Sequence, residues 1–179
     1  FASINGMNKH LILSAALLAG SLPVWAQSAK LVGAQSEVAF VTKQMGVPVD
    51  GKFKKFDAQI VLDPKKPEAG SVSFSIDTGS ASLGVPKSDA EMPKATWFNV
   101  AKFPQATFKS SAIKGLGGGK FEVAGRLDIK GNARDIVVPV QITQTGANST
   151  ATGSFVIKRL DFKICEGEWT DTTVVANDV

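Results

Sequence analysis

The stretch GRLDIKGNARDIVVPVQIT, residues 125–143, decides the fold class of this chain. Leu127 and Ile129 alternate with charged residues, and apolar residues again take every second place after Gly131-Asn132. Period-two alternation on both sides of a Gly-Asn break is typical of a β-hairpin with one apolar face and one face toward water. Pro139 falls on the outer face, where we expect an edge or a bulge because proline cannot donate to a ladder.

The same alternation recurs along the chain and predicts about eight strands separated by turn residues. The strand patterns cover residues 37–43, 56–63, 71–77, 105–113, 120–129, 136–142, 150–158 and 172–179, the last beginning a strand without finishing it. Residues 78–100 lack alternation, and residues 86–91 predict a short helix capped by Ser88 or Asp89. Gly125 inside a strand predicts a bend or a close backbone approach. The pattern therefore indicates an all-β, antiparallel sandwich or barrel with a short helical insertion.

Charge and histidine content restrict the function. The chain has 20 Lys and Arg against 16 Asp and Glu, a net charge of +4, and the charges are scattered in ones and twos. A nucleic-acid-binding face needs a basic stripe, so we expect no nucleic-acid partner. The only histidine, His10, lies in the leader described next, which leaves no Ser-His-Asp triad and no histidine metal ligand elsewhere. We expect no catalytic residues and no metal site.

Residues 7–26 have the three parts of a secretory signal peptide. A basic start is followed by the apolar run LILSAALLAGSL and by Val24-Trp25-Ala26, with cleavage after Ala26. The apolar run is shorter than the ~20 residues of a membrane span, and no stop-transfer charges follow it. We predict export, with residues 1–26 as upstream residues plus signal peptide and residues 27–179 as one domain. Phe1 to Gly6 are accordingly excluded from the fold.

Cys165 is the only cysteine, so the exported domain has no internal disulfide and depends on its core. The thiol could be reactive, form an intermolecular bridge or be a small buried residue. We favour the buried residue, because free cysteines are among the most buried side chains.

Four stretches together resemble the YceI-like family, the polyisoprenoid-binding periplasmic proteins. They are EVAFVTKQMGVPVDGKFKKFDAQI (residues 37–60), ATWFNVAKFPQATFKS (95–110), GRLDIKGNARDIVVPV (125–140) and FVIKRLDFKI (155–164). Their order and spacing are more specific than any one of them, and the resemblance runs from Glu37 to the end of the chain. It implies an eight-stranded, antiparallel, lipocalin-like barrel whose apolar lumen holds an isoprenoid chain in the periplasm.

Two features depart from the family pattern. Cys165 stands where the family more usually has glycine, so the turn there is expected to differ. The family pattern also continues past residue 179 with a further β-run. We therefore expect a truncated last strand and a barrel that is open or frayed along one seam, with unpaired backbone edges.

Strand parity selects the side chains that face the lumen. The inward candidates are Val38, Phe40, Phe56, Ile60, Phe74, Ile76, Phe108, Phe121, Val123, Leu127, Val138 and Val140, and the candidates for closing one mouth are Trp97, Phe98 and Phe103. Eleven Phe and three Trp without any Tyr can line a dry cavity, but they can equally fill a packed core. Parity alone does not separate these alternatives.

The resemblance makes a periplasmic carrier for an isoprenoid lipid the leading hypothesis. The ligand would be a polyprenyl chain or an isoprenoid quinone, and no other cofactor is expected. The alternatives are a quinone-linked redox accessory protein and a filled-core β-barrel interaction module without a ligand. A transient contact with a membrane or a membrane protein, and a homodimer, are both compatible with the sequence.

Overall fold

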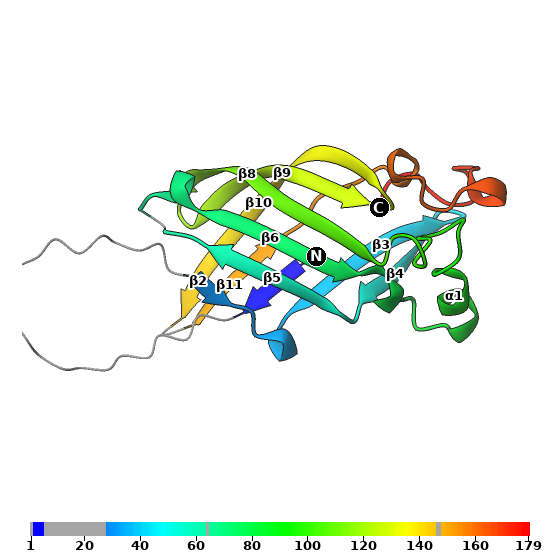
Figure 1. Ribbon diagram of the computed structural model, residues 1–179, viewed down its shortest axis with the longest axis horizontal. Helices are drawn as coiled ribbons and strands as arrows, with labels where there is room; N and C mark the ends of the chain where they lie inside the picture. The colour runs from blue at the N-terminus through cyan, green and yellow to red at the C-terminus, as the bar shows by residue number, and fades with distance from the viewer. Residues whose placement is uncertain (1, 6–27, 64, 146–147) are drawn as a thin grey trace, which may run out of the picture.

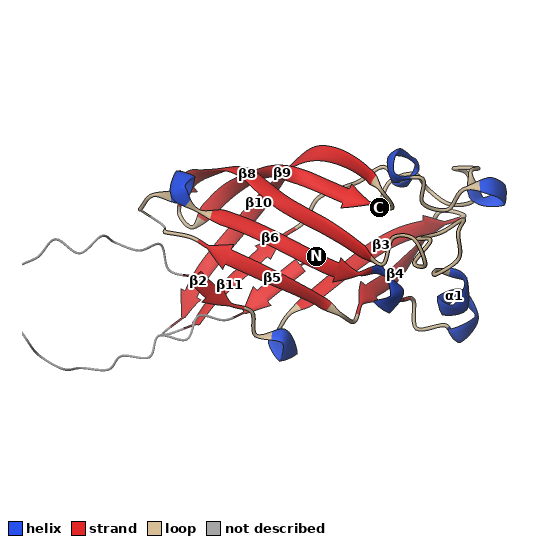
Figure 2. Ribbon diagram, in the orientation of Figure 1, coloured by secondary structure: helices blue, strands red, loops and turns tan. Residues whose placement is uncertain are grey.

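The computed structural model is antiparallel and mostly β, and its described residues include the short α-helix α1 (Figures 1 and 2). It describes residues 2–5, 28–63, 65–145 and 148–179. Among these residues, the strands of six or more residues are β3 (Glu37–Gln44), β4 (Val47–Phe53), β5 (Phe56–Val61), β6 (Ser71–Asp77), β8 (Gln105–Gly117), β9 (Lys120–Ile129), β10 (Asn132–Thr145) and β11 (Asn148–Gly153). The shorter strands are β1 (Ala2–Asn5), β2 (Ser28–Lys30) and β7 (Ala81–Ser82). The predicted fold class is confirmed.

The strands form one sheet in the order β2-β5-β6-β8-β9-β10-β11-β1-β3-β4-β7. β4 runs into β5 through Lys54 and Lys55, and β7 follows β6 through the 3-10 helix η3 (Thr78–Ser80). The Lys54 N–H donates to Ser80 O at 3.1 Å, and the Asp77 N–H donates to Lys55 O at 3.0 Å. The first bond continues the β4–β7 ladder and the second continues the β5–β6 ladder. The β4–β5 and β6–β7 corners carry the chain from one end of the sheet to the other, so the sheet curls into the elongated barrel of Figure 1.

The β9–β10 hairpin follows the prediction, with its turn one residue earlier. The turn is Lys130-Gly131, with φ of 54° and 72°, and Asn132 already pairs with Ile129. Two positive φ values in a two-residue loop match the right-handed twist of the flanking strands. Pro139 pairs with Glu122 of β9, while the ladder with β11 starts only at Val140. On that side Pro139 lies at an edge, as predicted.

The short helices lie mainly at the ends of the barrel (Figure 2). They are α1 (Pro86–Glu91) and the 3-10 helices η1 (Gly33–Gln35), η2 (Pro67–Ala69), η3 (Thr78–Ser80), η4 (Arg159–Phe162) and η5 (Gly167–Trp169). The position of α1 is as predicted, but the predicted cap is wrong. Val85 is the N-cap residue, and the Asp89 carboxylate instead accepts hydrogen bonds from the Leu83 N–H and the Ser82 hydroxyl. Pro86 at the first helical position removes a donor that would otherwise need a cap.

The segment that we set aside as upstream residues contributes β1 (Ala2–Asn5) to the sheet. β1 pairs with β11 over its four residues and with β3 at Glu37 and Val38. Strand edges carry unpaired N–H and C=O groups, and backbone pairing of this kind places little demand on sequence. β1 therefore lies between β11 and β3, at the seam that we expected to be open or frayed.

The C-terminal segment forms no strand, although residues 172–179 have a strand-like sequence. It makes two isolated bridges, Gln44 with Val175 and Lys158 with Asp178. Val175 therefore lies beside the edge of β3, and Asp178 lies beside the segment that follows β11. The strand-like pattern of residues 172–179 is therefore present as isolated bridges and not as a strand.

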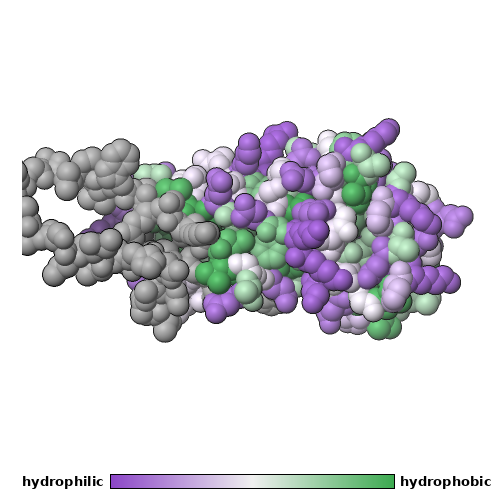
Figure 3. Space-filling view, turned by 60° about the horizontal axis from the view of Figure 1, so that its bottom comes forward, coloured by the Kyte–Doolittle hydropathy of each residue, from purple (hydrophilic) through white to green (hydrophobic). Residues whose placement is uncertain are grey.

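The core follows the alternation of the strands. In β9, Phe121, Val123, Gly125, Leu127 and Ile129 are buried, and the residues that alternate with them are half-buried or exposed. On the face drawn in Figure 3, hydrophilic side chains are spread over the barrel and hydrophobic ones show as separate patches. The inward faces are thus the continuous apolar surface of the molecule.

Candidate functional site

An apolar cavity of about 320 Å³ lies inside the barrel, toward the end that carries α1. Its wall is formed by β3, by the segment that contains Trp97 and Phe98, and by residues that follow β11. Phe40, Phe53 and Phe98 form one aromatic group there, with ring centroids 5.3 Å and 5.8 Å apart. The polar side chains in this wall are Thr42, Gln44, Ser154 and Arg159.

A second cavity of about 150 Å³ continues toward the other end of the barrel. It is lined by Val38, Ile60, Leu62, Val72, Phe74, Ile76, Phe108, Ile113, Phe121, Val123, Leu127, Val138, Val140, Ile142, Ala151, Thr152, Gly153 and Phe155. Thr152 is the only one of these with a polar side chain. Val38, Ile76 and Leu127 line both cavities, so the two form adjoining parts of one elongated lumen. Apolar walls without polar partners fit a hydrocarbon chain better than a polar solute.

Thirteen of the fifteen predicted site residues line this lumen. They are Val38, Phe40, Ile60, Phe74, Ile76, Trp97, Phe98, Phe108, Phe121, Val123, Leu127, Val138 and Val140. The structure therefore places them together around one space, and their contact with a ligand stays a prediction.

Phe56 and Phe103 do not line the lumen. Phe56 shares the parity of Ile60 but lies at the start of β5, beside the corner at Lys55, beyond the lining. Phe103 packs on the β9–β10 turn: a Cβ built on Gly131 would lie 2.8 Å from Phe103 Cε1. The Phe103 carbonyl also accepts a hydrogen bond from Thr78 Oγ1 at 2.9 Å. Strand parity predicts only which face of a strand a side chain takes. It does not show that Phe56 lies at a corner or that Phe103 packs on a turn.

Arg159 is a residue of the lumen wall that sequence reasoning missed. Its side chain is 1% exposed, and its five N–H groups all donate to backbone carbonyls. The acceptors are Ala176 O (Nε, 2.9 Å), Ile164 O and Cys165 O (Nη1, 3.1 and 2.8 Å), and Trp169 O and Val175 O (Nη2, both 2.7 Å). Because every donor is satisfied, Arg159 offers no free N–H to a ligand. The available signal was a pair of cations, Lys158 and Arg159, inside the otherwise largely apolar stretch FVIKRLDFKI.

A second buried cation lies nearby at Lys130. Its ammonium donates to Lys163 O at 2.6 Å and lies 3.7 Å from Glu166 Oε2. Burial lowers the pKa of Lys130, and the negative charge of Glu166 opposes this shift. Cys165 lines the larger cavity and is 4% exposed, and burial raises the pKa of its thiol to about 12. The thiol therefore stays neutral, as the interpretation of a small buried residue requires.

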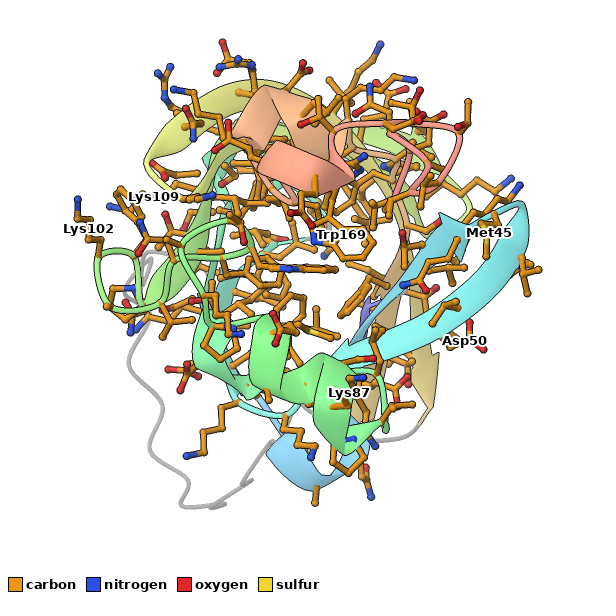
Figure 4. The ribbon with its side chains drawn as sticks, turned by 90° about the vertical axis from the view of Figure 1, so that its right-hand side faces the viewer. Met45, Asp50, Lys87, Lys102, Lys109 and Trp169 are labelled. Carbon is orange, nitrogen blue, oxygen red and sulfur yellow. The ribbon has the colours of Figure 1, made fainter. Side chains whose placement is uncertain are left out.

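The end of the barrel seen in Figure 4 carries a mouth with aromatic and apolar residues. Trp169 lies near the middle of this view, and its ring centroid is 6.3 Å from that of Trp97 in the lumen wall. On the rim, Met45 is 77% exposed and Val47 62% exposed, in and beside the β3–β4 turn. Met45 and Val47 therefore add exposed apolar surface at this end of the barrel.

The YceI-like domain matches residues 30–179 of the chain. The chain belongs to the YceI-like family. Among curated relatives, a UPF0312 protein of Vibrio cholerae is 30% identical over 145 residues, 78% of this chain and 77% of that protein. Protein YceI of Salmonella newport is 33% identical over 96 residues, 54% of this chain and 50% of that protein. The family resemblance inferred from the four sequence stretches is confirmed.

Solved structures of YceI-like proteins share this barrel. BcnA of Burkholderia cenocepacia is 45% identical, with a TM-score of 0.79 over 82% of this chain and 92% of that chain. The YceI protein of Campylobacter jejuni is 26% identical, with a TM-score of 0.65 over 73% and 79%. A polyisoprenoid binding domain of Saccharophagus degradans, 19% identical with a TM-score of 0.63 over 87% and 90%, shows likeness of fold.

In residues 2–5, 28–63, 65–145 and 148–179, no three His, Cys, Asp or Glu side chains gather in a way that could hold a metal ion. Within the same ranges, none of the helices has the length and apolarity that a membrane-crossing helix needs.

Proposed function

We propose that this YceI-like protein is an exported, periplasmic carrier that holds an isoprenoid lipid in the barrel lumen. The observation that carries the proposal is the elongated cavity with walls of Val, Ile, Leu and Phe and almost no polar side chains. Apolar surface that a ligand buries contributes about 25 cal/mol per Å² before the costs of association. The polyisoprenoid binding of the Saccharophagus degradans neighbour supports the ligand class.

The two cavities also suggest how the lipid lies. The smaller cavity, with Thr152 as its only polar side chain, suits the hydrocarbon tail. The larger cavity carries Thr42, Gln44 and Ser154, and these side chains suit the polar end of the molecule. A polyprenyl alcohol derivative and an isoprenoid quinone both have this division into a long apolar chain and one polar end.

The carrier hypothesis needs no chemistry from the protein. Arg159 uses all its donors internally, and burial holds the Cys165 thiol neutral. We propose a binding protein rather than an enzyme, because a carrier requires a shaped apolar space and not a positioned acid, base or nucleophile.

The test is to identify what the protein carries. The protein is purified from the periplasmic fraction without detergent, measured by native mass spectrometry, and then extracted with organic solvent for lipid mass spectrometry. We expect one additional mass per protein and an extracted lipid with a series of isoprene units. A protein that carries no lipid and takes up neither farnesol nor a short-chain ubiquinone would refute the carrier function and favour a filled-core module.

A further inference from the structure

A segment that we call the strap, residues 164–176, crosses the mouth of the barrel. At one end the Ile164 N–H donates to Arg159 O at 3.0 Å. At the other end the strap reaches the β3–β4 hairpin: the Met45 N–H donates to Val174 O at 2.7 Å, and the Ala176 N–H donates to Lys43 O at 2.9 Å. Both ends are thus tied to the barrel.

Arg159 holds the strap from inside the barrel. All five carbonyls that accept its hydrogen bonds belong to the strap: Ile164, Cys165, Trp169, Val175 and Ala176. A planar guanidinium presents its donors in a fixed fork, so it orients these separate parts of the strap relative to one another. Lysine, with three donors on one atom, cannot reproduce the arrangement.

The first half of the strap contains two residues with a left-handed backbone. Cys165 and Gly167 both have left-handed φ values, 58° and 71°. A non-glycine residue in this region is strained and persists only where its surroundings enforce it. A Cβ added at Gly167 would meet only Thr96 Cγ2, at 3.9 Å. The Glu166 N–H donates to Thr96 O at 2.9 Å, which links this part of the strap to the opposite side of the mouth.

Trp169 is the large side chain of this first half. It is 41% exposed and does not line the lumen, but its ring packs against Trp97, which does. Figure 4 shows it across the mouth, between the segment of α1 and the hairpin that carries Met45. Movement of Trp169 would therefore uncover Trp97 and the lumen without breaking the sheet.

We propose that the strap is the gate of the lumen, with Trp169 as the moving part and Arg159 as the positioning residue that keeps it closed. The inference rests on the proposed function, since a gate needs a ligand that passes it. A gate that contacts no ligand changes the rates of entry and release by the same factor and leaves the affinity unchanged. This property separates a gate from a binding residue.

The first experiment measures rates and affinity for Trp169→Ala. Bound N-phenyl-1-naphthylamine is released by mixing with excess phosphatidylcholine vesicles in a stopped-flow fluorimeter, and entry is followed separately. Loss of the aromatic pair is expected to speed entry and release roughly two- to tenfold at unchanged affinity. The control is Val137→Ala on the outer face of β10, where the side chain is 58% exposed, and we expect unchanged rates. A weaker affinity at an unchanged entry rate would make Trp169 a binding residue and overturn the gate.

The second experiment locks the strap with a disulfide. Thr96→Cys and Glu166→Cys are combined with Cys165→Gly, because the hydrogen bond between these two backbones brings residues 96 and 166 within the range of a disulfide. The oxidised form should release the probe at least about tenfold more slowly than the reduced form of the same protein, in line with a closed route. Equal rates in the two forms would show that the ligand enters elsewhere, for example between β3 and β11.

The lock also tests Arg159. Arg159→Lys should speed release, and the disulfide should restore slow release in the same variant. Because a disulfide also stabilises an unstable variant, the thermal midpoints of the oxidised and reduced forms are compared with the release rates. Failure of the rescue removes Arg159 from the gate. If the unmodified protein binds neither the probe nor farnesol, the proposed carrier function fails, whereas binding with insensitivity to the lock rejects only the gate.

Discussion

The ring of Phe108 in β8 lies directly against the backbone of Gly125 in β9. A Cβ built on Gly125 would come within 2.5 Å of Phe108 Cζ and 2.4 Å of Lys109 O. The ladder between the two strands shifts register between Ser110 and Ala112, and Ser110 is the partner of Gly125. The predicted close backbone approach at Gly125 is therefore present, and it gives the Phe108 ring its place in the lumen wall.

Gly125→Ala should destabilise the protein by about 1–3 kcal/mol, because the new methyl group meets a backbone oxygen as well as a ring. Gly33→Ala is the matched control, since nothing lies within 4 Å of its added Cβ. Urea unfolding of both variants gives the comparison. Equal midpoints for the two would show that β8 and β9 separate easily at the bend.

Val137 and Val138 are adjacent in β10, and their side chains face opposite sides of the barrel wall. Val138 lines the lumen, whereas Val137 is 58% exposed. Val138→Lys should abolish lipid retention and cost several kcal/mol of stability, because it buries an unpaired ammonium. Val137→Lys should keep both lipid and stability, within about 0.5 kcal/mol.

Lipid content by extraction and thermal midpoint by circular dichroism measure the two effects. Val138→Thr, which keeps the shape and adds one hydroxyl, tests occupancy with less risk to folding. Lipid loss in the Val137 variant together with retention in the Val138 variants would reverse the assigned faces of β10.

Strand β1 precedes the predicted cleavage site, so removal of the signal peptide would also change the barrel. Cleavage after Ala26 would remove β1 and expose the edges of β11 and β3 that it now pairs. A chain that starts at Gln27 should therefore be about 2 kcal/mol less stable than the chain of 179 residues, the net worth of a few hydrogen bonds. It should also associate more readily through the exposed edges.

Thermal midpoints and light scattering of the two chains provide the measurement, and an added peptide of residues 1–6 should recover part of the loss. Identical midpoints and no response to the peptide would mean that β1 adds nothing to the barrel.

Asp89 makes the stability sensitive to acid. The pKa of its carboxyl is lowered, first by the hydrogen bond from the Leu83 N–H and then by that from the Ser82 hydroxyl. A carboxylate whose pKa is lower in the folded state stabilises the fold above the unfolded-state pKa of 3.8, and this contribution disappears as the pH falls through the folded value.

The thermal midpoint of the wild type should therefore fall more between pH 7 and pH 3 than that of Asp89→Asn, which starts lower at pH 7. Asp135→Asn is a control, because the Asp135 side chain is 85% exposed on the outside of β10. If wild type and Asp89→Asn lost equal amounts, the carboxylate would not tie α1 to β7.

The Cys165 thiol should react very slowly in the folded protein. With a pKa of about 12, only about one thiol in ten thousand is ionised at pH 8, so iodoacetamide should react far more slowly than after unfolding in urea. The raised pKa also means that stability falls as the pH rises from about 9 toward 12, because only the unfolded chain releases the proton. Cys165→Gly should lack this alkaline loss, and its glycine suits the φ of 58°. Rapid labelling of the folded protein would contradict the burial.

Strand parity located most of the lumen because it is a local property. Val123, Leu127 and Val138 face inward since side chains alternate along a strand whatever the sheet does at larger scale. Phe56 and Phe103 are also large apolar residues. Phe56 lies outside the lumen because it is at a corner of the barrel, and Phe103 lies outside it because it packs on a turn. Asp89 stands where the sequence predicts a helix cap, but its carboxylate accepts a hydrogen bond from the Ser82 hydroxyl of β7. These differences depend on neighbours that are distant along the chain.

By itself, the sequence determined the all-β class, the family, the main hairpins and the inward face of each long strand, because alternation and turn residues act over a few positions. Only the tertiary structure decided that β1 fills the edge between β11 and β3, that Arg159 gathers five carbonyls of one strap, and that Trp169 meets Trp97 at the mouth. Pairing of free strand edges, burial of a charge and contact between distant rings depend on closure of the barrel, and no local pattern encodes them.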